Sequence, residues 1–133
     1  MNDPATVLVA PDAFKGTMTA SQVSAALVAG LRRAGVQADS CPVADGGEGT
    51  LEALAKPWGA RRLTVTVNDP LGRPVAAELA LTERSHRAPP VAIVEVAAAS
   101  GLGLVAASER DPVAAGTFGT GELVAAALAA GAE

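Results

Sequence analysis

A strand signal, a helix signal and a second strand signal follow one another before residue 42, and this order limits the possible folds most strongly. Thr6–Ala10 is a short apolar run bounded by turn residues, which is typical of a buried parallel strand. Thr19–Gln22 (TASQ) has the pattern of a capping box and predicts a helix that continues to about Ala34. Val36–Cys41 is the second strand. A right-handed βαβ unit is therefore expected, in an α/β protein with a parallel sheet.

The rest of the chain also alternates between strand and helix signals. Gly119–Ala130 is a loop that runs into a helix, and Leu123–Ala130 has apolar residues on every face, so that segment should be buried on all sides. The sequence offers too little to cover it, which indicates a fragment or a chain that packs on a partner. The other predicted elements are a short helix, a hairpin and a further buried strand: Thr50–Lys56, Leu63–Val67 with Val75–Leu81, and Val91–Val96.

A polar segment ending in two prolines, Thr82–Pro90, is the best candidate for a domain boundary. It predicts a first α/β domain at residues 1–82, a linker at 83–90, and the incomplete beginning of a second α/β domain at 91–133. If the fragment folds alone, exposed apolar surface along Val91–Val96 and Leu123–Leu128 predicts self-association.

Composition excludes several classes of function. The formal net charge of −4 argues against a nucleic-acid or membrane-surface role, since both need a basic face. The single Cys41 excludes an internal disulfide framework and a four-cysteine metal site, and it is expected to be a buried apolar residue. No secretory leader pattern and no apolar run long enough for a membrane span occur. A soluble, cytoplasmic protein is the expectation.

The first candidate loop, Pro11–Thr19, follows the first strand and precedes the helix. Ligands of open parallel sheets bind beyond the carboxyl ends of the strands, and helix N-termini attract anions. Lys15, one of two lysines, stands beside Gly16 where a phosphate or carboxylate would dock. The alternative is that Asp12 only caps the turn and Lys15 is solvated.

The second candidate loop, Ala44–Thr50, is more specific. Three glycines in four positions allow close approach of a ligand to the backbone, and two carboxylates flank them. Acids suit Mg²⁺ or a hydroxyl proton, and amides suit an anion. The alternative is a flexible acidic turn in which Glu48 caps the short helix. The candidate residues here are Asp45, Gly46, Gly47, Glu48, Gly49 and Thr50.

Weaker candidates lie further along the chain. Glu95 interrupts an apolar run, so it should face a cleft or pair with an arginine. Gly101–Ala106 matches G-x-G-x-x-A, but the strand ends several residues earlier, so a dinucleotide site is not expected. Four residues before the last helix form either an anion cradle or a tight loop: Thr117, Gly119, Thr120 and Gly121.

Taken together, five segments resemble the ATP-dependent bacterial glycerate kinases, and they occur in the expected order. Two departures are Ala13, where a serine is common, and Phe118, where a tyrosine is usual. The segments are Ala10–Thr19 (APDAFKGTMT), Pro42–Thr50 (PVADGGEGT), Asn68–Val75 (NDPLGRPV), Glu95–Leu104 (EVAAASGLGL) and Gly119–Ala126 (GTGELVAA).

The resemblance implies transfer of a phosphoryl group from ATP, with Mg²⁺, to a hydroxyl of D-glycerate, at the 2-position rather than the 3-position. It also implies two α/β domains, the first flavodoxin-like, with the site between them. This chain matches only the N-terminal portion: a glycine-rich segment with Ser, Asn and Asp that contributes to the nucleotide site is absent, as is the returning C-terminal part of the first domain.

Roles follow from the resemblance residue by residue. Lys15 would neutralise the glycerate carboxylate or the transferring phosphoryl group, and Asp45 would contact Mg²⁺ or the substrate hydroxyl. These two are the candidate catalytic residues. The candidate substrate-binding residues are Asp12, Gly16, Gly46, Gly47, Glu48, Gly49 and Thr50.

Three classes of function remain. The chain is either part of a catalytic kinase or a truncated, non-catalytic anion-binding remnant of one, and these two share every residue shown. The 133-residue chain alone is expected to be inactive. A different enzyme, flavodoxin-like or dinucleotide-binding, is disfavoured because aromatic residues that could stack on a flavin or adenine are scarce.

Overall fold

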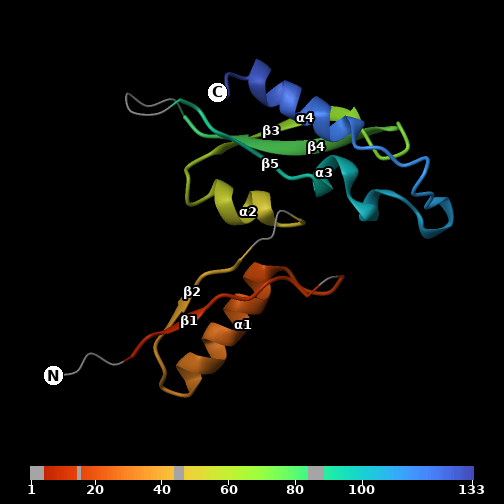
Figure 1. Cartoon of the computed structure of the whole chain (residues 1–133). Coiled ribbons are helices and arrows are strands. Elements are labelled where there is room, and N and C mark those ends of the chain that lie inside the picture. Colours follow the sequence, from red (N-terminus) through yellow and green to blue (C-terminus); the bar gives the residue numbers. More distant parts are fainter. Residues whose placement is uncertain (1–4, 15, 44–46, 84–88) are drawn as a thin grey trace. The chain divides into compact units, whose positions relative to one another are not determined.

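The computed structural model describes residues 5–14, 16–43, 47–83 and 89–133. The chain divides into two compact units, Met1–Asp45 and Gly46–Glu133, and each is described by itself (Figure 1). The elements in chain order are β1 (Val7–Val9), α1 (Ala20–Arg33), β2 (Ala38–Ser40), α2 (Thr50–Ala55), β3 (Arg61–Asn68), β4 (Pro74–Leu81), β5 (Ala92–Val94), α3 (Ala97–Ser100), the 3₁₀ turns η1 (Leu102–Leu104) and η2 (Ala107–Glu109), and α4 (Phe118–Ala129).

The first unit is the predicted βαβ arrangement. β1 and β2 are parallel, with Val7 opposite Ala38, and α1 packs on one face of the pair (Figure 1). Val9, Val28 and Ala38 form a small apolar core between the helix and the strands. The α/β class and the parallel strands are confirmed.

Both ends of α1 follow the sequence prediction closely. The Thr19 hydroxyl accepts from the Gln22 amide at 3.2 Å, and the Thr19 amide donates to the Gln22 side chain at 2.9 Å, which completes the capping box. At the other end Gly35 has φ +77°, and the amide of Val36 donates to the carbonyl of Leu31. This left-handed residue stops the helix, as expected for glycine after a helix end.

The first strand is buried on one face only, whereas the sequence predicted a fully buried strand. Val9 is 5 % exposed, but Leu8 is 66 % exposed, because α1 covers one face of the described strand pair. Cys41, predicted to be buried, is exposed just after β2. β1 is therefore apolar on both faces, although the described residues cover only one of them.

The second unit is an antiparallel sheet in the order β3–β4–β5 with helices on both faces. On one face Leu79 and Val67 pack against Leu123 of α4. On the other face Ala80 and Ile93 pack against Leu51 and Ala55 of α2 (Figure 1). The predicted hairpin is confirmed, with Asn68 opposite Pro74 at its turn.

The division between the units differs from the predicted boundary at 83–90. β5, which follows that segment, pairs with β4, which precedes it. The Thr82 amide donates to the Val91 carbonyl at 2.9 Å, and the Val91 amide donates to the Thr82 hydroxyl at 2.8 Å. A polar, proline-rich segment here joins two neighbouring strands of one sheet, so its composition marks a strand connection. The contacts divide instead between Asp45 and Gly46.

Helix α4 begins earlier than predicted and is not buried on all sides. Gly119 lies inside its first turn, where a loop was expected. Leu123 is fully buried, whereas Val124 is 46 % and Leu128 is 60 % exposed. The helix packs by one face although its sequence is apolar all round. The predicted self-association through this surface stays a prediction.

No helix within the described ranges is both long enough and apolar enough to cross a membrane.

The close contact of α4 with β3 gives a stability prediction. A Cβ atom at position 119 would collide with the carbonyl of Asn68, whereas one at position 121 would meet nothing within 4 Å. Gly119→Ala should destabilise the chain by about 2 kcal/mol or more, because the clash is with backbone. Gly121→Ala in the same helix should be neutral or stabilising by up to about 1 kcal/mol. Urea unfolding of both variants checks this, and equal midpoints would refute the assigned contact.

Candidate functional site

The first candidate loop forms a compact turn. The Phe14 amide donates to the Met18 carbonyl at 2.9 Å, and the Met18 amide donates to the Phe14 carbonyl at 3.0 Å. The Thr17 hydroxyl also donates to the Phe14 carbonyl, at 2.8 Å. Gly16 has φ +76°, which explains why a glycine stands at this bend. The described residues Phe14, Thr17 and Met18 are thus joined by local hydrogen bonds.

Among the predicted residues of this loop, Asp12 is exposed and its carboxylate accepts from the Ala13 amide at 2.7 Å. This bond is local, as the alternative in which Asp12 caps the turn expects, and the substrate-binding role of Asp12 stays a prediction. Three of the predicted site residues lie outside the described residues: Lys15, Asp45 and Gly46. Their roles stay predictions.

The second candidate loop is described from Gly47 onward and runs directly into α2. Gly49 has φ +92°, and the Thr50 hydroxyl donates to the Gly47 carbonyl at 2.8 Å. Leu51, the second residue of the helix, is buried against the sheet. The loop is therefore a defined left-handed turn attached to the core.

Glu95 holds this loop, a role that differs from the one predicted for it from the sequence. Its Oε2 atom accepts from the Gly49 amide at 3.1 Å and from the Leu51 amide at 3.0 Å. A cleft or an arginine partner had been expected for Glu95, and Glu48 had been the alternative cap for the helix. The structure gives the capping role to Glu95, half-buried just after β5. Two amides that could have met a substrate anion are thereby occupied by a carboxylate of the protein.

The side chain of Glu48 lies beside Gly101–Ala106, the segment in which no dinucleotide site is expected. A Cβ atom at Gly103 would lie 3.6 Å from Glu48 Oε1, so the side chain of Glu48 lies beside η1. The segment that matched G-x-G-x-x-A follows β5 through α3 and forms 3₁₀ turns. Gly103 of this segment therefore lies next to Glu48 of the second candidate loop, which is called the glycine loop below. No pattern in the sequence signalled this proximity.

The third set of candidates has packing roles. Gly119 is buried against Asn68, and the hydroxyls of Thr120 and Ser100 share a hydrogen bond of 2.7 Å. Glu122 accepts from both the backbone amide of Asn68, at 2.7 Å, and its side-chain amide, at 3.0 Å. These contacts explain the spacing of the small residues at the start of α4. An anion-binding role for Thr117, Gly119, Thr120 and Gly121 stays a prediction.

The turn between β3 and β4 is organised by Asp69. Its buried carboxylate accepts from the amides of Leu71 and Arg73 at 2.8 Å each, and from the Arg73 guanidinium at 2.6 Å. Arg73 also reaches Glu109 at 3.1 Å and the Leu104 carbonyl at 3.3 Å. The turn is thus joined to η1 and η2. The sequence predicted the turn but not this network.

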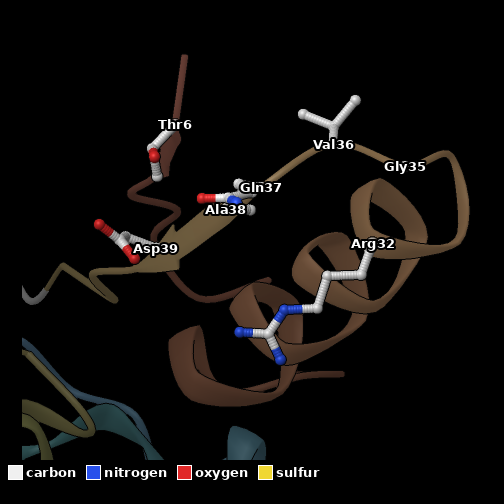
Figure 2. A pocket seen from close by; sticks show the side chains of 7 residues that line it. All are labelled: Thr6, Arg32, Gly35, Val36, Gln37, Ala38 and Asp39. Atoms are coloured by element: carbon white, nitrogen blue, oxygen red, sulfur yellow. The ribbon is translucent and has the colours of Figure 1, made fainter. Parts of the chain in front are cut away.

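A hollow of about 440 Å³ lies elsewhere, at the amino-terminal side of the first strand pair. Figure 2 shows Arg32 entering it from α1, while Thr6 and Asp39 line it from the strand side. It contains no residue of the predicted loops. Across the described ranges, no three His, Cys, Asp or Glu side chains are grouped so as to hold a metal ion.

Comparison with known proteins gives one consistent result. The model of the glycerate kinase family matches residues 7–133. The chain is 41% identical over 129 residues to a glycerate kinase of Bacillus subtilis, covering 96% of this chain and 33% of that relative. It is 43% identical over 129 residues to a glycerate 2-kinase of Escherichia coli, covering 95% of this chain and 32% of that relative. The chain thus spans about a third of the length of these relatives.

The fold agrees with this result. A crystal structure described as that of a glycerate kinase 2 from Salmonella typhimurium LT2 superposes with a TM-score of 0.72 at 38% sequence identity. The match covers 98% of this chain and 34% of that one. Nearly the whole chain therefore has a counterpart in a longer polypeptide.

The Asp69 network predicts a dependence of stability on pH. Burial alone would raise the pKa of the Asp69 carboxyl, but the hydrogen bonds from Arg73 and Leu71 outweigh it and leave that pKa below the ordinary value of 3.8. The stabilisation is therefore complete above about pH 4 and is lost as the pH falls through the lowered pKa.

We expect Asp69→Asn to lower the urea midpoint at pH 7 and to flatten its decline in acid. The exposed carboxylate of Glu83 belongs to the same unit, and Glu83→Gln should retain the acid decline of the unmodified chain. An Asp69→Asn variant with an unchanged acid profile would show that this carboxylate does not govern it.

Proposed function

Since this chain belongs to the glycerate kinase family, we propose that its two loops bind D-glycerate and present one of its hydroxyls for phosphorylation by ATP. The observation that carries the proposal is the family match over residues 7–133, which includes both loops. The described geometry supports it in one respect. Glu95 fixes the glycine loop in a single backbone conformation, as a loop that positions a substrate requires.

The residue types suit phosphoryl transfer, in which proteins act mainly by positioning and by stabilising charge. Lys15 would bind the carboxylate of glycerate or an oxygen of the transferring group, and Asp45 would accept the proton of the reacting hydroxyl. Glu48 and Asp45 offer the oxygen ligands that Mg²⁺ prefers, and the ion would neutralise charge on the ATP phosphates. Because ATP is the proposed donor, the cytoplasm is the proposed compartment.

We propose the 2-hydroxyl of D-glycerate as the acceptor, because the relative from Escherichia coli is named a glycerate 2-kinase. A chimera in which this chain replaces the corresponding third of the Bacillus subtilis glycerate kinase should yield 2-phosphoglycerate. Phosphorus-31 NMR of the product, against authentic 2- and 3-phosphoglycerate, decides between the two. Accumulation of the 3-isomer as the first product would refute the regiochemical proposal.

The second candidate function is binding of glycerate without turnover. It is worth testing because the chain spans only about a third of the length of its relatives. A coupled assay for ADP should detect little or no turnover by the 133-residue chain and clear turnover by the chimera. Turnover by the chain alone would exclude the binding-only alternative. An inactive chimera that folds and binds glycerate would support it.

Lys15 can be tested against a matched control, because the chain contains a second lysine. Lys56 lies at the exposed end of α2. In the chimera Lys15→Met should lower turnover by about 100-fold or more, as removal of a charge-stabilising group does in other enzymes, with unchanged circular dichroism. Lys56→Met should retain normal turnover. Near-normal turnover of Lys15→Met would remove Lys15 from the site.

A further inference from the structure

The carboxylate of Glu95 joins two parts of the chain that are far apart in sequence. Residues 49 and 51 precede it by 46 and 44 positions, and both of their amides donate to one atom, Oε2. Hydrogen bonds to an ionised acceptor are among the stronger ones in proteins. Glu95 itself follows β5, whose Ile93 is buried against α2, so its position is fixed by the core.

The glycine loop needs such an anchor. Gly49 is in a left-handed conformation, and a Cβ atom at this position would meet nothing within 4 Å, so no side-chain packing there defines the turn. A glycine-rich backbone has many alternative conformations, and ordering it costs free energy. The two bonds to Glu95 select one conformation at the point where the loop enters α2.

We propose that Glu95 is a positioning residue for substrate binding: it holds the loop from Gly47 to Leu51 in the conformation that contacts D-glycerate. This inference rests on the proposed function. In this assignment Glu95 acts through the loop, because its Oε2 accepts from two backbone amides of that loop. Other groups of the loop would then contact glycerate, and Glu48, whose carboxylate lies beside Gly103, is one candidate.

Three variants of the 133-residue chain test the assignment. Glu95→Ala removes the shared acceptor of both amides, and Glu95→Gln keeps the size and one acceptor oxygen but loses the charge. Glu78→Gln is the control, because Glu78 lies in the same unit in an exposed ion pair with Arg62. Amide hydrogen exchange at residues 49 and 51 is measured by NMR, and D-glycerate is titrated into each variant.

We expect exchange at both amides to accelerate about 10-fold or more in Glu95→Ala and by less in Glu95→Gln, as for loss of a hydrogen bond to a charged group. The amide of Asn68, which Glu122 holds, should keep its protection. The dissociation constant of D-glycerate should rise in the same order, while Glu78→Gln behaves as the unmodified chain. A role in filling space alone would leave Glu95→Gln unchanged.

The outcomes separate the two proposals. Unchanged exchange in Glu95→Ala, or faster exchange with unaltered glycerate affinity, overturns the positioning role. If Glu95→Ala does not fold, the charge-only variant Glu95→Gln decides by the same two measurements. Failure of the unmodified chain to bind D-glycerate counts against the proposed function. The positioning role in substrate binding is then refuted too, even if hydrogen exchange shows that Glu95 anchors the backbone.

Discussion

The second unit depends on one strand that is buried on both faces. In β4 the consecutive residues Leu79 and Ala80 are both fully inaccessible, and their side chains serve opposite layers. Leu79 packs with α4, and Ala80 packs with α2. Alternation of side chains across a strand makes this possible only if both helices are in place. The same strand therefore positions the glycine loop, through α2, and the start of α4.

In addition to the apolar core, three carboxylates stabilise the ends of strands and helices. Glu95, Glu122 and Asp69 each accept at least two amide hydrogen bonds, and each fixes a place where a strand or helix begins or ends. A charge that replaces water at several backbone amides stabilises the turn it serves, whereas a lone buried charge would be costly. These three acidic residues thus act as structural acceptors, so a count of carboxylates overstates the number that remain for chemistry.

The sequence predicted what depends on near neighbours. The capping box at Thr19, the helix stop at Gly35 and the hairpin with its turn all rest on residues within a few positions of one another. Contacts between residues that are far apart in the chain were not predicted. Glu95 meets amides more than 40 positions away, and no local pattern encodes that contact. Composition also does not tell a linker from a strand connection: the strands on either side of residues 83–90 pair with each other, and the predicted domain boundary there stays a prediction.

The two candidate loops differ in what shapes them. One loop is closed by its own hydrogen bonds between Phe14 and Met18, so its shape is a local property of the first unit. The other is shaped by Glu95, so its conformation depends on the sheet of the second unit. A substitution in β4 or β5 should therefore alter the conformation of this loop even though it lies outside the loop. The first loop has no such dependence on distant residues of the second unit among its described hydrogen bonds, and sequence changes there should act on the site directly.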